Sequence, residues 1–249
     1  MKISQILKRA FIVRKCILCG EVIDYDRKAP FCDECTSLWL ANLDLMCIKC
    51  GFDCDYCTCL PDKVREINHS IASFGVFYSP ELMTPVNRVV YKLKRNYNFE
   101  VIRFCAEVMK RKAIKLCAKL SINYRSFIVT FPPRRRDAVL EYGYDHAKLL
   151  AKEFAIKMGL ELRECFKNVG KKEQKGLSRS DRLFNAINSF KVKDGIDVKG
   201  KSVFLVDDVM TSGATLNACA KMLIFEGAKQ VIPITFAKDT KTNTSNLID

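Results

Sequence analysis

The feature that most constrains the fold is a short apolar run that ends in two adjacent carboxylates. Residues 201–206 read Lys-Ser-Val-Phe-Leu-Val, and Asp207 and Asp208 follow directly. Such a run predicts a strand buried on both faces, which is typical of a parallel sheet covered by helices. Small and hydroxylated residues over 211–215 then lead into a predicted helix over 215–226. We therefore expect an α/β fold in which this strand delivers its carboxylates to the sheet edge where ligands bind.

The remaining elements fit the same architecture. The predicted strands cover residues 71–78 (an edge or hairpin strand), 127–131 and 230–236, and the predicted helices cover residues 81–96, 100–120 and 145–158. Strands that alternate with helices along the chain imply a parallel sheet flanked by helices.

The loop after the two aspartates suits a phosphate group. It offers backbone N–H groups, hydroxyls and the positive end of a helix dipole to one anion, and Gly213 permits close approach of the backbone. The carboxylates lie one ribose length away, placed for ribose hydroxyls or a Mg²⁺ ion. An ordinary strand end with an acidic cap is the alternative, although two aspartates before Thr-Ser-Gly-Ala-Thr form a more specific pattern. The candidate ligand-binding residues are Asp207, Asp208, Val209, Met210, Thr211, Ser212, Gly213, Ala214 and Thr215.

This segment resembles the phosphoribosyl-pyrophosphate (PRPP) motif of type I phosphoribosyltransferases. The resemblance implies that Asp207 and Asp208 engage the ribose hydroxyls and act in catalysis, with Mg²⁺ bound together with PRPP. It also implies that the loop wraps the 5-phosphate.

Nine of the thirteen cysteines lie within residues 16–59. Two knuckles of the form Cys-x-x-Cys-Gly begin at Cys16 and Cys47, and their glycines allow a tight turn that points amides at the thiolates. A third pair begins at Cys32, at a spacing that suits a zinc ribbon. The predicted ligands of the first structural Zn²⁺ are Cys16, Cys19, Cys32 and Cys35. Redox dithiols or an iron–sulfur cluster are the weaker alternatives.

The ligands of a second metal are less constrained. Cys47 and Cys50 form its first pair, and spacing favours Cys54 and Cys57 as the second. Because only a short loop separates Cys50 from Cys54, a site that uses Cys57 or Cys59, or no second metal at all, stays open. We therefore divide the chain into a zinc-ribbon module (residues 1–62) and a ligand-binding domain (residues 63–249).

The positive charge is concentrated in one stretch. The chain carries a net charge of +14, and residues 88–136 contain 14 basic and 2 acidic residues interleaved with tyrosine and phenylalanine. This mixture favours single-stranded nucleic acid, and a solvated basic face is the competing interpretation. The candidate nucleic-acid contacts are Lys92, Lys94, Arg95, Lys110, Arg111 and Lys112. We expect no membrane span, because no apolar run approaches about 20 residues, and the lack of a secretory signal favours a cytoplasmic location.

Together with the cysteine knuckles, the segments Tyr142–His146 and Gln174–Phe190 are similar to the ComF family, competence-associated proteins with a zinc ribbon fused to a phosphoribosyltransferase domain. The central motif of that family usually begins with arginine where this chain has Tyr142. Arg134, just after a predicted strand, is expected to contact pyrophosphate, with a solvated basic turn as the alternative. Arg182 lies in a polar segment that resembles the family's mobile flap, with a surface loop as the alternative. We expect His146 to pack or cap a helix.

Three hypotheses follow. The first is a ComF-like protein of DNA uptake in natural transformation that binds PRPP and single-stranded DNA and works with other DNA-uptake proteins, with phosphoribosyltransferase turnover left open. The second is a nucleobase salvage or amidophosphoribosyl transferase with no DNA role. The third is a binding protein whose transferase site has lost activity. The cysteine module argues against the second hypothesis, and the intact acidic pair argues against complete loss of the ligand site.

Overall fold

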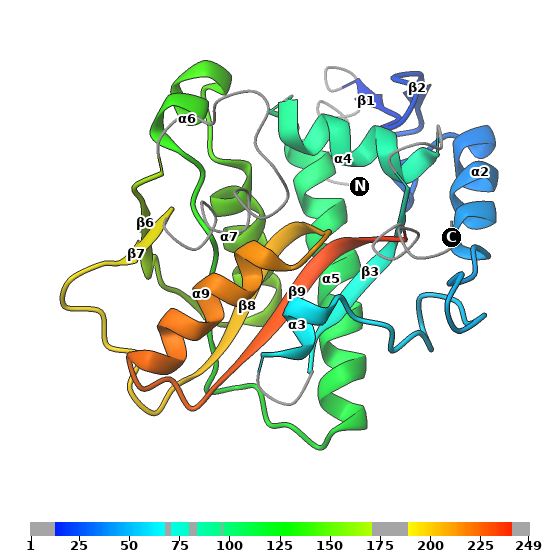
Figure 1. Cartoon of the computed structure of the whole chain (residues 1–249). Helices are drawn as coiled ribbons and strands as arrows, with labels where there is room; N and C mark the ends of the chain where they lie inside the picture. The colour runs from blue at the N-terminus through cyan, green and yellow to red at the C-terminus, as the bar shows by residue number, and fades with distance from the viewer. Residues whose placement is uncertain (1–12, 68–70, 80–83, 96, 171–188, 241–249) are drawn as a thin grey trace, which may run out of the picture.

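The computed structural model describes residues 13–67, 71–79, 84–95, 97–170 and 189–240. At its centre is a parallel five-stranded sheet in the order β3-β9-β8-β4-β5 (Figure 1). The strands are β3 (Ser73–Tyr78), β9 (Gln230–Asp239), β8 (Ser202–Met210), β4 (Ile128–Thr130) and β5 (Glu161–Leu162). The α/β class expected from the sequence is confirmed.

Helices cover both faces of this sheet. Helices α4 (Pro85–Arg95), α5 (Phe99–Lys119) and α7 (His146–Met158) belong to one core cluster, and α9 (Ala214–Phe225) and α3 (Asp62–Arg65) belong to the other. Strand β8 contributes side chains to both clusters, because successive side chains of a strand point to opposite faces. Phe204 and Val206 pack into the first cluster, and Val203 and Leu205 pack into the second. This strand is therefore buried on both sides, as its apolar run predicts.

The observed elements differ from the expected ones in two respects. Strand β8 continues through both aspartates to Met210, because its backbone stays paired with β9 as far as Lys238. The short edge strand β5, the antiparallel pair β6 (Phe166–Asn168) and β7 (Phe190–Val192) and the helix α6 (Arg136–Tyr142) were not expected. Each is too short to show a hydrophobic period.

The cysteine-rich segment packs against the sheet domain. It contains the antiparallel pair β1 (Arg14–Lys15) and β2 (Val22–Ile23) and the helix α2 (Asp33–Leu43). Trp39 of α2 lies with its ring centroid 4.9 Å from that of Phe104 on α5 and 6.4 Å from that of Phe236 on β9. The module and the sheet therefore share one core, and α3 spans the expected boundary between residues 62 and 63. Within the described ranges, no helix has the length and apolar character needed to cross a membrane.

Candidate functional site

Residues 209–215, called the phosphate loop here after their predicted role, surround a small cavity at the carboxyl end of β8. Asp207, the loop and Leu216 line this cavity, whose volume is about 40 Å³. Helix α9 begins at Ala214, so its N-terminus and the partial positive charge of its free N–H groups lie at the cavity wall. The structure thus brings the loop residues named from the sequence together with Asp207, and their role in ligand binding stays a prediction.

Gly213 fixes the shape of this loop. Its φ is +75°, a left-handed conformation that disfavours residues with a Cβ. A Cβ built here would lie 2.3 Å from Cγ2 of Val64 on α3. Asn217 Nδ2 on α9 also donates a hydrogen bond of 2.6 Å to the carbonyl of Lys63. Helix α3 therefore supports the loop from behind, through contacts that leave no room for a side chain at position 213.

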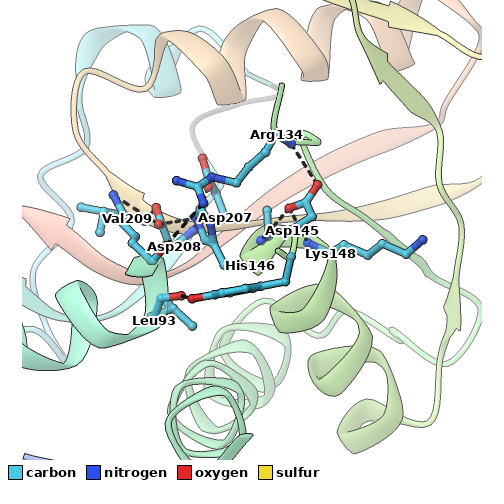
Figure 2. Close-up of polar contacts among 11 residues, drawn as sticks. Leu93, Arg134, Asp145, His146, Lys148, Asp207, Asp208 and Val209 are labelled. Carbon is cyan, nitrogen blue, oxygen red and sulfur yellow. Dashed lines mark hydrogen bonds and ion pairs between the residues drawn. The ribbon is translucent and has the colours of Figure 1, made fainter. Parts of the chain in front are cut away.

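Asp208 faces helices α4 and α7. One of its carboxylate oxygens, Oδ2, lies 2.8 Å from Nε2 of His146 (Figure 2). The same oxygen lies 3.2 Å from Nζ of Lys94. The other oxygen, Oδ1, accepts a 2.6 Å hydrogen bond from the backbone N–H of Val209. Burial alone raises the pKa of this carboxyl group, but the Lys94 ammonium and His146 outweigh it and hold the pKa below its usual range. Asp208 is therefore ionised at neutral pH.

Asp207 is in a different electrostatic state. Its side chain accepts a 2.8 Å hydrogen bond from the backbone N–H of Asp208 and lines the cavity of the phosphate loop. Burial and the adjacent negative charge of Asp208 raise the pKa of Asp207 to about 7. Asp208 is paired with Lys94 and His146, whereas Asp207 is the carboxylate that lines the cavity, and its role toward a ribose hydroxyl or Mg²⁺ stays a prediction. An oxygen ligand of this kind, completed by phosphate oxygens and water, suits Mg²⁺.

Arg134 joins the loop after β4 to the same site. Its backbone N–H donates to Oδ2 of Asp145 over 3.0 Å, and its guanidinium contacts the carbonyl of Lys94 at 3.4 Å. The guanidinium carbon also lies 5.0 Å from the centroid of the Tyr142 ring. Tyr142 stands at the position where the ComF family usually has arginine, and its ring stacks against the guanidinium of Arg134. Arg182 and the rest of the expected flap over 171–182 fall outside the described residues.

His146 is buried, as the expectation of packing predicts, but it does not cap the helix. Asp145, whose carboxylate accepts from the N–H groups of Ala147 and Lys148, caps helix α7. His146 instead binds Asp208, and in the part of the chain that the structure describes its buried Nδ1 has no hydrogen-bond partner. The two residues are 62 positions apart in the chain, so only the packing of α7 on β8 reveals the contact.

The first cysteine cluster, Cys16, Cys19, Cys32 and Cys35, forms as predicted. Its four sulfurs lie within 4.8 Å of one another, and those of Cys19 and Cys32 are 3.7 Å apart. Four Zn–S bonds of about 2.3 Å in a tetrahedron give sulfur–sulfur distances of about 3.8 Å. Burial acts to raise the pKa of Cys16, but hydrogen bonds from the backbone N–H groups of Cys19, Cys32 and Leu18 outweigh it and lower the pKa to about 6. The donor set therefore fits zinc.

The second cysteine cluster differs from the predicted set by one ligand. It consists of Cys47, Cys50, Cys57 and Cys59. The assignment of Cys54 is wrong, because a tight turn in which Cys57 N–H donates to the Asp53 carbonyl over 2.9 Å leaves Cys54 outside the group. The Cys54 thiol instead lies 3.4 Å from Nζ of Lys112 on α5. With Cys59 in its place, this cluster is also compatible with zinc.

The six basic residues proposed for nucleic acid do not form one surface. Lys94 is paired with Asp208, and Lys112 is largely buried against Asp55, so neither is a free cation of an open basic face. Arg111 pairs with Glu107 on the exposed side of α5. Lys92, Lys94 and Arg95, by contrast, line a groove of about 660 Å³ between α4 and the first cysteine knuckle. The other residues along this groove are Leu18, Cys19, Tyr78, Asn87, Arg88, Val90 and Tyr91.

Residues 138–245 match the family model described as phosphoribosyl transferase domain. This range contains His146, Asp207, Asp208 and the phosphate loop. The fold is that of a phosphoribosyltransferase domain, with two four-cysteine clusters in front of it. No curated protein sequence matches the chain.

Several solved structures are similar to part of the chain. The glutamine phosphoribosylpyrophosphate amidotransferase from B. subtilis, complexed with ADP and GMP, is 17% identical over 61% of this chain, with a TM-score of 0.36. This chain spans 30% of the length of that enzyme. A hypoxanthine phosphoribosyltransferase from Staphylococcus aureus is 13% identical over 57% of this chain and 74% of its own, with a TM-score of 0.34.

Proposed function

We propose that the chain binds PRPP with Mg²⁺ at the end of β8 and transfers its phosphoribosyl group to an acceptor. The observation that carries this proposal is the phosphate loop, in which Asp207, a helix N-terminus and the glycine-dependent turn at Gly213 surround one cavity. In this proposal the loop N–H groups and hydroxyls hold the 5-phosphate, and Asp207 receives a ribose hydroxyl or the Mg²⁺ ion. Asp208, fixed by Lys94 and His146, holds a negative charge near the ribose ring.

The chemistry would be a displacement at C1 of the ribose. The lone pair of the acceptor nitrogen forms the new bond to C1, and the C1–O bond to pyrophosphate breaks with its electrons left on the pyrophosphate. The acceptor nitrogen then releases a proton to water. Negative carboxylates near the ring stabilise the positive charge that develops there, and cations such as Lys94 and Arg134 stabilise the leaving group. Mg²⁺ bound with PRPP would add charge neutralisation of the pyrophosphate.

Binding and turnover are tested separately. Calorimetric titration of PRPP in the presence of Mg²⁺ should give one saturable site, and ribose 5-phosphate should compete for it through the phosphate loop. Pyrophosphate release in the presence of candidate acceptor bases or ammonia then measures transfer. Release with a free base or ammonia and no response to DNA would favour the salvage or amidophosphoribosyl alternative.

We further propose a ComF-like role in DNA uptake, in a cytoplasmic protein organised as residues 1–62 and residues 63–249. The supporting observation is the groove beside α4, which is lined by Arg88, Lys92, Lys94, Arg95 and the exposed ring of Tyr91. Cations interleaved with a stacking surface suit single-stranded DNA. Because Lys94 also contacts Asp208, the groove adjoins the proposed PRPP site.

Fluorescence anisotropy with a labelled oligonucleotide at several salt concentrations tests this role. The variant Arg88→Gln/Arg95→Gln should weaken binding and flatten its salt dependence, because each lost phosphate contact removes counterion release. The matched control Lys110→Gln/Arg111→Gln removes the same charge outside the groove and should bind as the wild type does. Equal losses in both variants would assign the effect to net charge. A transformation assay in a deletion strain complemented with each variant then tests for a role in DNA uptake.

A further inference from the structure

A buried lysine lies between the second cysteine cluster and the sheet. Lys238 of β9 is only 4% exposed. Its Nζ is 3.4 Å from Sγ of Cys57, and it lies 4.9 Å from the ring centroid of Phe74 and 5.4 Å from that of Phe77. Phe74, Phe77 and Cys47 form one buried cluster, against which the other cysteines of the second cluster pack. The ammonium is therefore enclosed by a metal-ligand sulfur and two aromatic faces.

An ammonium in such a position needs a compensating negative charge, because burial removes its hydration. Two aromatic faces supply only part of this charge, through their quadrupoles. Four thiolates around one divalent zinc ion carry a net double negative charge, and a thiolate sulfur accepts hydrogen bonds. The second cysteine cluster with its metal is thus suited to compensate Lys238, and Lys238 in turn stabilises the cluster as an outer-shell donor.

The same cluster is connected to the phosphate loop by two short routes. Along the sheet, Lys238 is in register with Met210, the residue at which β8 enters the loop. Along the chain, Cys59 is followed almost at once by α3 (Asp62–Arg65). That helix places Val64 directly behind Gly213 and is bonded to α9 through Asn217. The helix that backs the loop is therefore joined to the second cluster along the chain, and the strand that carries Lys238 is paired with the strand that leads into the loop.

We propose that the second cysteine cluster is a metal-dependent support for the phosphate loop, with Lys238 as its counter-cation. The first cysteine cluster reaches the sheet through Trp39, which packs on Phe104 of α5 and Phe236 of β9, whereas the second cluster is followed in the chain by α3, the helix behind the loop. Loss of the second metal should loosen residues 209–215, whereas the first metal should not respond to substitution of Lys238.

The test compares the zinc-loaded full chain with its Lys238→Met variant, which keeps the side-chain length without the charge. Lys152→Met, an exposed lysine on α7, is the matched control. Competition with a chromogenic chelator measures each metal, and amide hydrogen exchange measures the loop. We expect Lys238→Met to lower the affinity for one of the two metal ions by about 10–100-fold, the range typical for loss of an outer-shell donor. Exchange at residues 209–215 should accelerate, while Lys152→Met should match the wild type.

Two results would overturn the inference. The first is wild-type affinity for both metals in Lys238→Met, and the second is loss of one metal with unchanged exchange at residues 209–215. If Lys238→Met does not fold, Cys59→Ser perturbs the cluster from outside the sheet, and unchanged loop exchange in that variant would reject the support role. Neither readout uses PRPP, so a failure of PRPP binding and a failure of this inference are distinguishable.

Discussion

The substitution Gly213→Ala tests the contact between α3 and the phosphate loop. Two costs are expected, because alanine at a φ of +75° is strained and because its Cβ would lie 2.3 Å from Cγ2 of Val64 and 3.3 Å from its backbone N. The left-handed conformation costs about 1–2 kcal/mol, and overpacking of this kind costs about 1–3 kcal/mol. Urea unfolding of the zinc-loaded protein should therefore show a loss of about 2–5 kcal/mol.

The double variant Gly213→Ala/Val64→Ala separates the two costs. Val64 is fully buried, so Val64→Ala alone should cost about 1–3 kcal/mol. In the double variant the clash with Cγ2 is gone, so the backbone strain of alanine at position 213 and the loss of the buried Val64 side chain remain. The two substitutions should therefore cost about 1–2 kcal/mol less together than the sum of their separate effects. A change below about 0.5 kcal/mol in Gly213→Ala, or strict additivity in the double variant, would refute the proposed packing.

Three further predictions concern the carboxylates, the second metal and the sheet. Since Asp207 has a raised pKa, its ionisation costs stability as pH rises toward about 7, and PRPP with Mg²⁺ should bind about tenfold more weakly at pH 6 than at pH 8. Calorimetry measures how PRPP affinity depends on pH, and Asp207→Asn should lose the part of this dependence that comes from Asp207. The same pH dependence in the wild type and in Asp207→Asn would contradict the assignment. Metal analysis should find one zinc in Cys59→Ser and two in Cys54→Ser. Two zinc ions in Cys59→Ser and one in Cys54→Ser would instead support Cys54 as the ligand, as expected from the sequence. Gly75→Ala should unfold the chain or cost about 3 kcal/mol or more, because the new Cβ would lie 2.3 Å from the carbonyl oxygen of Phe236; near-wild-type denaturant stability would contradict this.

The elements that could be predicted are those whose signals are local. Strand β8 and helix α9 follow from a continuous apolar run and a small-residue loop, both visible within about fifteen residues. The first cysteine cluster is equally local, because knuckle spacing determines which thiols meet. The extension of β8 to Met210 was missed, since it depends on pairing with β9 and not on the character of Asp207 and Asp208.

The parts that could not be predicted depend on contacts between distant segments. His146 and Lys94 meet at Asp208 only because α7 and α4 lie on the same face of the sheet. The choice of Cys59 over Cys54 depends on a turn and on a lysine of α5. Charge counting likewise grouped Lys94 and Lys112 with exposed residues, although both are held by carboxylates. The sequence shows how many cations the stretch contains, but it does not show which carboxylates they pair with.

The most direct test of the central claim is a calorimetric titration of PRPP into the zinc-loaded protein with Mg²⁺. The wild type and the double variant Asp207→Ala/Asp208→Ala are compared, with metal content and thermal unfolding as controls for folding. We expect saturable binding to the wild type and none to the double variant, because the variant lacks both carboxylates at the end of β8. Unchanged PRPP affinity in a folded double variant would contradict the assignment of this site.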